Sequence, residues 1–330
     1  MADYDVITLG ETMLRLSPTN LRRIEQANEL ELYIGGTESN TAVGLARLGL
    51  KVCWLSRLTD NPLGRLLAGK IAQHGVDTSH VTWTEEDRIG LLFLEEGKAP
   101  RGSRVIYDRQ GSAASRMRAG DLPRPLFHPT GARLFHTTGI TLAIGTDPAA
   151  AAAEAVSWAK EAGWLVSFDL NYRSTLWSPA TARRGCDPIM QQADILFLPE
   201  RDAILLYELA PDTPSEGVLR TIAERYPRAL IALTLGPEGA IALAPGGEIH
   251  RQASFPAEEV DRIGGGDAFS AGFLYGYLSD KRGDSNIATA LRWGAAAAAL
   301  KYGIRGDFPV ITRSEVEALI EGATGAGVVR

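Results

Sequence analysis

The residues best suited to chemistry lie toward the C-terminal end of the chain, where Gly264, Gly265 and Gly266 immediately precede Asp267. An apolar pattern with helical spacing starts at once, at Ala268. Glycines before a helix let several backbone N–H groups converge on one point, and the helix dipole adds partial positive charge there. Such a point suits a phosphate. Because a carboxylate can accept a proton from a hydroxyl, Asp267 beside this anion site is the minimum needed to phosphorylate an alcohol.

The same residues also have a simpler interpretation, in which the glycines form a tight turn and Asp267 is only a helix N-cap. Other motifs exclude some alternatives. The chain has no Gly-x-x-x-x-Gly-Lys-Ser/Thr sequence, which excludes a P-loop kinase. Gly10 stands alone after the first apolar run, so the dinucleotide-binding fingerprint is missing. The five histidines are scattered, which argues against a His/Cys metal centre.

Composition limits the partners and the compartment. The 330 residues carry a net charge of −6, which argues against nucleic acid or an anionic membrane as the main partner. The two cysteines, Cys53 and Cys186, lack metal-like spacing, so we expect buried free thiols in a reducing compartment. The N-terminal stretch lacks a basic segment followed by a long apolar run, so we expect no secretory signal and a cytoplasmic protein.

The elements that must position the candidate residues follow from alternating strand-like and helical patterns along the whole chain. This alternation predicts parallel βαβ units, and hence an α/β fold with a central, mostly parallel sheet flanked by helices. Two segments, residues 11–34 and 88–112, instead resemble exposed strands, and we expect them to form a small β-sheet lid. We interpret residues 1–330 as a single domain. The expected core strands are residues 4–9, 52–58, 134–136, 165–169, 195–198 and 230–235.

Several polar or glycine-rich stretches follow these strands, where ligands of α/β proteins bind. Three of the four have an alternative structural explanation: a helix cap, an exposed surface residue or an ordinary hairpin turn. An arginine after a core strand could bind a carboxylate or phosphate through two hydrogen bonds. The candidates are Gly35, Gly36 and Asn40; Tyr107 and Arg109; Asn171 and Arg173; and Thr234, Gly236 and Gly239.

These motifs together resemble a known family. Residues 261–274 are similar to the C-terminal signature of the PfkB (ribokinase-like) carbohydrate kinases, and residues 35–64 to the N-terminal one. Order and spacing agree over roughly residues 4–322. Residues 107–113 and 169–177 resemble the 2-keto-3-deoxygluconate kinase subgroup in particular.

The resemblance implies a ribokinase-like fold and an ATP- and Mg²⁺-dependent kinase that phosphorylates a sugar or sugar acid, with 2-keto-3-deoxygluconate as the leading substrate. Asp267 would be the catalytic base. Gly264, Gly265 and Gly266 would form the anion hole. The sugar acid would contact Gly35, Gly36, Asn40, Tyr107, Arg109 and Arg173. The nucleotide would contact Asn171, Thr234, Gly236, Gly239, Gly264 and Gly266. Exposed lid strands need covering, so we expect a homo-oligomer, such as a homodimer, formed through the lid.

Some positions depart from the family pattern. Arg262 and Ile263 replace residues that are usually threonine, proline or small, and Leu92 replaces a tyrosine. Residues 199–202 replace the Asn-x-x-Glu sequence near the magnesium ion, which leaves the metal ligands undefined. Two alternatives therefore remain: a kinase for a neutral sugar such as fructose or ribose, or for another ketogluconate, and a non-catalytic sugar- or nucleotide-binding protein. The intact Gly-Gly-Gly-Asp sequence argues against the second.

Overall fold

A central sheet organises the protein, seen in a computed structural model that describes residues 2–279 and 286–322. Within these residues the sheet has nine strands in the order β15-β14-β13-β12-β11-β10-β1-β4-β6. From β13 to β6 neighbouring strands pair in parallel, whereas β14 and β15 pair antiparallel at one edge. The strands are β1 (Val6–Leu9), β4 (Val52–Leu55), β6 (Val76–Asp77), β10 (Leu134–Thr138), β11 (Leu165–Asp169), β12 (Ile195–Pro199), β13 (Leu230–Thr234), β14 (Ala240–Leu243) and β15 (Ile249–Gln252).

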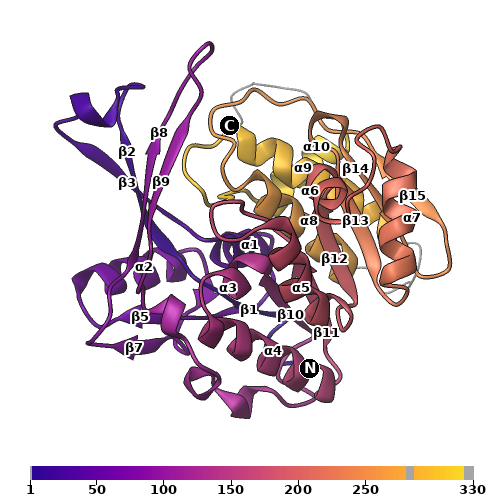
Figure 1. Cartoon of the computed structure of the whole chain (residues 1–330), viewed down its shortest axis with the longest axis horizontal. Helices are drawn as coiled ribbons and strands as arrows, with labels where there is room; N and C mark the ends of the chain where they lie inside the picture. Colours follow the sequence, from indigo (N-terminus) through magenta and orange to yellow (C-terminus); the bar gives the residue numbers. More distant parts are fainter. Residues whose placement is uncertain (1, 280–285, 323–330) are drawn as a thin grey trace.

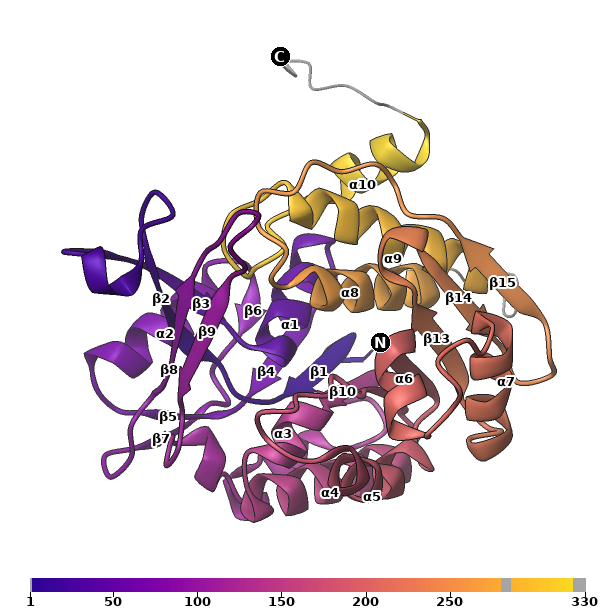
Figure 2. The ribbon, with the colours of Figure 1, turned by 45° about the horizontal axis from the view of Figure 1, so that its top comes forward.

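Helices cover both faces of this sheet, as Figure 2 shows. Successive strand residues point to opposite faces, so Ile7 and Leu9 join one hydrophobic core while Val6 joins the other. The first core lies under α3 (Gly139–Ala143), α4 (Thr146–Glu161), α5 (Pro179–Met190), α6 (Glu200–Leu206) and α7 (Ser215–Arg225). The second lies under α1 (Thr37–Arg47), α2 (Pro62–Ala72), α8 (Gly265–Ser279), α9 (Asn286–Tyr302) and α10 (Arg313–Ile320). In the described residues no helix is both long and apolar enough to cross a membrane.

Local signals explain where several helices begin. Asn61 caps α2 by accepting hydrogen bonds from the backbone N–H groups of Leu63 and Gly64, and Pro62 occupies the first helical position. Ser178 and Pro179 start α5 in the same way. These caps fix the residue at which each of the two helices begins.

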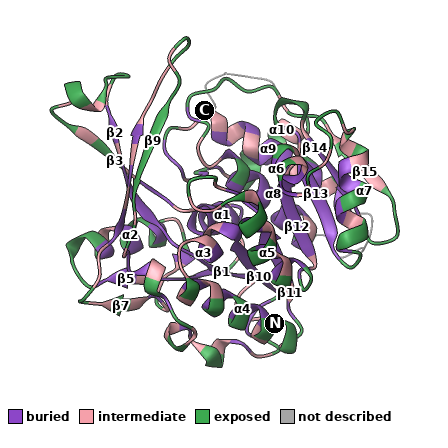
Figure 3. Cartoon of the chain, in the orientation of Figure 1, coloured by how far each residue is buried: buried purple, intermediate pink, exposed green. Residues whose placement is uncertain are grey.

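A second sheet stands beside the main body, with the order β3-β2-β8-β9 in the described chain. It consists of β2 (Met13–Pro18), β3 (Leu30–Gly35), β8 (Gly90–Glu95) and β9 (Arg104–Asp108). Every residue of β9 is exposed, as Figure 3 shows. A short parallel pair, β5 (Arg57–Thr59) with β7 (Thr82–Thr84), completes the strands named here. That this sheet acts as a lid on a single 1–330 domain remains a prediction, and residues 1, 280–285 and 323–330 lie outside the described residues.

Helix α8, which carries Asp267 in its first turn, is buried on almost every side. Gly272 and Gly276 allow this close packing, because a Cβ at either position would press against the backbone of α9 at Trp293 or Ala290. The α8 helix also packs against α1. The first turn of α8 is therefore held from two sides.

Candidate active site

A cavity of about 650 Å³ lies between the small sheet and the carboxyl ends of the main-sheet strands. Its wall brings together every predicted catalytic and sugar-contacting residue, although these are spread over more than 230 positions of sequence. Contributions come from Gly35, Gly36, Asn40, Tyr107, Arg109, Asn171, Arg173, Thr234, Gly264, Gly265, Gly266 and Asp267. The two remaining candidates, Gly236 and Gly239, line an adjoining cavity of about 120 Å³. Thr234, Gly265 and Gly266 line both cavities, so the two spaces meet at the glycine turn.

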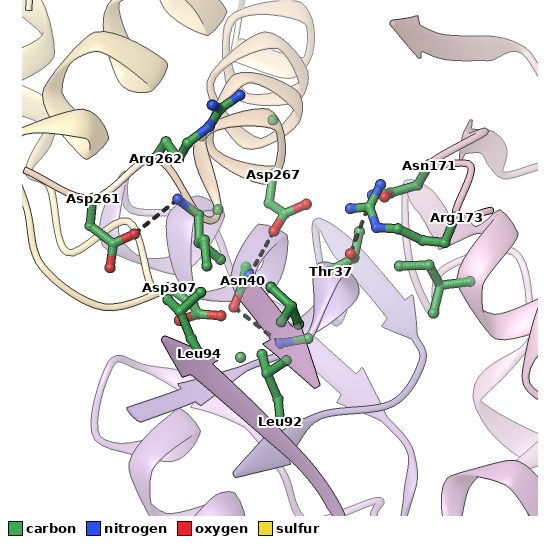
Figure 4. A pocket seen from close by; sticks show the side chains of 18 of the residues that line it. Thr37, Asn40, Leu92, Leu94, Asn171, Arg173, Asp261, Arg262, Asp267 and Asp307 are labelled. Carbon is green, nitrogen blue, oxygen red and sulfur yellow. Dashed lines mark hydrogen bonds between the residues drawn. The ribbon is translucent and has the colours of Figure 1, made fainter. Parts of the chain in front are cut away.

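Asp267 is the best-defined group in this cavity. Its side chain is buried, and its Oδ2 accepts a hydrogen bond of 2.6 Å from the Asn40 Nδ2 atom. Figure 4 shows Asn40 reaching from α1 toward the Asp267 carboxylate on α8. Burial raises the pKa of Asp267 to about 6, while the Asn40 hydrogen bond and the charge of Arg173 oppose the shift. A carboxyl group with a pKa near neutrality is suited to accept a proton.

In the glycine turn, residues 264–266, the first and last glycines differ in how much space surrounds them. Gly264 has a φ of +81°, and a Cβ there would collide with the Asp307 carbonyl oxygen. At Gly266, in contrast, a Cβ would meet no described atom within 4 Å. The Gly265 N–H donates to the Arg262 carbonyl at 3.2 Å, so this amide is used inside the turn. The prediction of an anion hole then depends on the amides of Gly264 and Gly266.

Gly35 and Gly36 are required by packing. A Cβ at Gly35 would collide with the Asp307 carboxylate, and one at Gly36 would collide with the Glu11 carbonyl oxygen. The Gly36 N–H donates to Asn40 Oδ1 at 3.3 Å, which helps to orient the amide that reaches Asp267. These glycines therefore bring the small sheet and α1 close to the site, and their predicted direct contact with a sugar stays a prediction.

The two predicted arginines differ in their surroundings. The Arg109 guanidinium is paired with the buried Glu11 carboxylate and lies 5.8 Å from the centre of the Tyr107 ring. Arg173 donates to the Tyr172 carbonyl at 3.1 Å and forms no ion pair with any residue that the structure describes. Most hydrogen-bonding capacity of the Arg173 guanidinium is therefore available to a ligand in the cavity.

Two carboxylates near the ends of neighbouring strands are absent from the predicted site residues. Asp169 ends β11, and burial together with the charge of Asp267 raises its pKa to about 7. Asp202 lies in the first turn of α6, directly after β12, and its buried Oδ2 has no hydrogen-bond partner among the described residues. The same holds for the Oδ1 atom of Asn171, whose Nδ2 donates to Thr37. The position of Asp169 and Asp202 at or just after the ends of adjacent parallel strands, where ligands of α/β proteins bind, is the sequence signal that could have identified them.

The smaller cavity is lined mostly by apolar side chains and glycines. Its wall includes Phe255 and three alanines of α9, Ala295, Ala298 and Ala299. Small side chains at these positions leave room beside the glycine turn for a planar ring.

The chain resembles known proteins over nearly its whole length. A profile of the pfkB family carbohydrate kinases matches residues 3–307. The 2-dehydro-3-deoxygalactonokinase of Haloferax volcanii is 40% identical over 326 residues, which cover 99% of both proteins. The crystal structure of 2-dehydro-3-deoxygluconokinase from Thermotoga maritima is 33% identical, with a TM-score of 0.89, covering 97% of this chain and 99% of that one.

A crystal structure of a candidate ribokinase II from Escherichia coli, solved in complex with ATP and Mg²⁺, has a TM-score of 0.84. It is 21% identical and covers 96% of this chain and 99% of that one, a likeness that shows the fold. The ribokinase-like fold predicted from the sequence is thus confirmed, with its mostly parallel sheet, its flanking helices and its small second sheet. The chain belongs to the pfkB family of carbohydrate kinases, and it is a sugar kinase.

Proposed function

We propose that this kinase transfers the γ-phosphoryl group of ATP to the terminal hydroxyl of a 2-keto-3-deoxy sugar acid, with Asp267 as the general base. The observation that carries the proposal is the Asp267 carboxylate. It is buried beside the glycine turn and faces the same cavity as Asn40 and Arg173. A base, an anion site and a free guanidinium in one cavity match the three needs of this reaction.

ATP would lie across the junction of the two cavities. The adenine ring would enter the smaller, apolar cavity beside Gly239 and Ala298, and the phosphates would extend over Gly265 and Gly266. This orientation directs the γ-phosphate into the larger cavity, toward Asp267. The name of the ribokinase-like neighbour solved with ATP supports the choice of nucleotide.

The residues present also fit a magnesium ion. Mg²⁺ takes oxygen ligands and is usually held by one or two carboxylates together with substrate phosphates. Asn171 and Asp169 line the larger cavity, and the Asn171 Oδ1 atom has no partner in the described chain. Asp202, which lies outside the wall of both cavities, adds a second buried oxygen without a described partner. When bound, the ion would neutralise charge on the phosphates.

In the proposed reaction the acceptor oxygen attacks the γ-phosphorus, and the bond to the bridging oxygen of ADP breaks. The acceptor proton passes to Asp267. The amides of Gly264 and Gly266, together with the N-terminal end of α8, would stabilise the charge on the phosphoryl oxygens. Asn40 would hold the Asp267 carboxylate in place through its 2.6 Å hydrogen bond.

The acid group of the substrate would bind Arg173, with Arg109 and Tyr107 completing the wall. The named relatives act on 2-dehydro-3-deoxy acids of two sugar configurations, which supports this substrate class. A neutral sugar such as fructose or ribose, or another ketogluconate, is the alternative acceptor. Leu92 lines the cavity, and its apolar side chain offers no hydrogen bond to an acid sugar or to a neutral one.

The test is ADP release from Mg-ATP with 2-keto-3-deoxygluconate, its galactonate counterpart, 2-ketogluconate, fructose and ribose. We expect turnover with the 3-deoxy acids and a loss of about 10²–10⁴-fold in kcat in Asp267→Asn. Arg173→Ala should raise KM for an acid far more than for a neutral sugar, and we expect the same direction for Arg109→Ala. Full activity in Asp267→Asn would exclude this residue as the base, and turnover of neutral sugars alone would exclude the acid substrate.

We also propose that two copies pair through their small sheets and that the enzyme is cytoplasmic. The exposed edge strand β9 supports pairing, because the unpaired backbone N–H and C=O groups of an edge strand can hydrogen-bond to another strand. Cys53 and Cys186 are buried free thiols, which favours a reducing compartment. ATP as the proposed phosphoryl donor favours the same compartment.

A further inference from the structure

A buried cluster of charges connects the small sheet to the glycine turn. Its centre is Arg15 on β2, which has no exposed surface. The Arg15 Nη1 atom lies 2.7 Å from Asp307 Oδ1 and 2.9 Å from Asp261 Oδ2, and Nη2 lies 3.3 Å from Glu96 Oε1. One guanidinium thus contacts two carboxylates that lie more than 240 positions away in sequence.

Asp261 connects this guanidinium to the start of the turn. Its Oδ1 accepts a hydrogen bond of 3.1 Å from the Ile263 N–H, which Figure 4 shows, and its Oδ2 accepts another of 3.1 Å from the Gly306 N–H. Both carboxylate oxygens are therefore occupied, so the conformation of residues 261–263 depends on where Asp261 is held. Gly264 follows directly.

Asp307 is wedged between the two walls of the cavity. Its carbonyl oxygen occupies the space that a Cβ of Gly264 would need, and its carboxylate occupies the space that a Cβ of Gly35 would need. Gly35 ends β3, while Gly264 begins the glycine turn. A displacement of Asp307 would therefore move the sugar side of the cavity and the anion side relative to one another.

Lys301 on α9 completes the cluster from the far side. Its buried Nζ donates to the carbonyl oxygens of Asp261 at 2.9 Å and Ile304 at 3.0 Å. The two cations, Arg15 and Lys301, balance the two buried carboxylates of Asp261 and Asp307. Buried charges that are paired and hydrogen-bonded on all sides tolerate little displacement.

We propose that Arg15 is a positioning residue for phosphoryl transfer, which fixes the small sheet against the glycine turn so that an acceptor hydroxyl lies between Asp267 and the γ-phosphate. Arg15 is absent from the cavity wall formed by the described residues, so it acts through Asp261 and Asp307. The inference rests on the proposed function, in which the small sheet contacts the acceptor and Asp267 is the base. A purely structural ion-pair cluster would stabilise the fold without affecting this alignment.

The test compares Arg15→Met with Arg57→Met as the matched control. Arg57 forms a 3.0 Å ion pair with the buried Asp87 and lies outside the cavity wall in the described residues. Both changes should lower Tm. In Arg15→Met we expect kcat to fall about 10²-fold, because a misplacement near 1 Å has that effect, while KM for ATP changes less than about threefold. In Arg57→Met kcat and both KM values should stay near those of the unmodified enzyme.

Rates are expressed per folded molecule, counted by the stoichiometry of binding of a non-hydrolysable ATP analogue in calorimetry. Arg15→Lys keeps the charge and one nitrogen for Asp261 and Asp307 but loses the Nε and Nη2 contacts with Ser17 and Glu96, so its kcat should lie between those of Arg15→Met and the unmodified enzyme. Asp307→Asn should lower kcat in the same manner, and the double variant Arg15→Met/Asp307→Asn should be no slower than the worse single variant. If Arg15→Met does not fold, Arg15→Lys and Asp307→Asn decide the question.

An unchanged kcat in folded Arg15→Met, or in the two conservative variants, would overturn the inference. An equal loss in Arg57→Met would do so as well, because it would show a general effect of destabilisation. Any acceptor that the unmodified enzyme phosphorylates can be used. A failure of the acid-sugar assignment would therefore appear in the substrate panel, and a failure of the base assignment in Asp267→Asn, and neither would be confused with a failure at Arg15.

Discussion

The negative charge of Asp267 acts on two other buried carboxyl groups, those of Asp169 and Glu38, and helps to raise the pKa of each. Burial raises the pKa of Asp267 to about 6 and that of Asp169 to about 7, and the charge of Asp267 adds to the second shift. Burial likewise raises the pKa of Glu38 to about 7, although hydrogen bonds from Thr141 and Thr138 oppose it. A general base works only when deprotonated, and the pKa values of the ligand-free enzyme govern kcat/KM, so kcat/KM should rise with pH through roughly 6. A pH–rate profile that is flat between pH 5 and 7 would contradict this prediction.

The same pKa shift predicts a gain in stability when the base is removed. The folded state binds the Asp267 proton more tightly than the unfolded state does, since the pKa rises from 3.8 to about 6. The folded protein is therefore destabilised as pH rises through this range, and the full effect is present above pH 6. Asp267→Asn should increase the free energy of unfolding at pH 7.5 by up to roughly 3 kcal/mol. Urea denaturation at pH 7.5 and pH 5 checks this, because the gain should shrink at the lower pH.

Among individual residues, the sequence predicts those site residues that belong to a recognisable local motif. The Gly-Gly-Gly-Asp sequence predicts Asp267 and its glycines as site residues, and the residues around Asn40 predict a helix start there. Arg15 could not be assigned, because its partners lie far away in sequence and nothing near it marks it as buried. The pairing of Arg109 with Glu11 was missed for the same reason.

Within the element formed by the glycine turn and α8, two glycines should respond differently to the same substitution. Gly264→Ala places a side chain at positive φ and against the Asp307 carbonyl, so we expect a loss of at least about 1–2 kcal/mol in stability. Gly266→Ala meets no described atom, so the fold should persist. Because Gly266 lines both cavities, its added methyl group should weaken ATP binding instead.

Thermal denaturation and calorimetric ATP titration of the two variants separate these effects. Gly264→Ala should shift Tm, whereas Gly266→Ala should shift the ATP dissociation constant at nearly unchanged Tm. Equal Tm losses in both variants would contradict the distinction between a glycine needed for backbone conformation and one needed for ligand space.

The main strands were predictable because short apolar runs between helical patterns specify buried parallel strands. Less could be predicted at the sheet margins. Strands β15, β5 and β7 carry one apolar residue each, which is too few to identify them as strands from the sequence.

At the scale of the whole molecule, the small sheet has two different faces. Leu92 and Leu94 of β8 line the cavity, so the alternate residue Phe93 points to the other side. Cross-strand register extends this outer side into an apolar row, since partners opposite one another share a face. The row consists of Leu32, Leu16, Phe93 and Ile106. Its ends, Leu32 and Ile106, are 58% and 42% exposed, which leaves the row to be covered by another surface.

If a second copy covers this row, a charge within it should separate the two. Burying a glutamate of each copy in an apolar interface without a partner would be strongly unfavourable, so Ile106→Glu should convert a dimer into a monomer. Leu63→Glu is the control, because Leu63 is similarly exposed, at 46%, but lies on α2. Light scattering after size-exclusion chromatography gives the mass of each. A dimeric mass for Ile106→Glu, or a monomeric mass for the unmodified protein, would rule out pairing through this row. If the Ile106→Glu monomer keeps the kcat of the unmodified enzyme, each copy holds a complete active site.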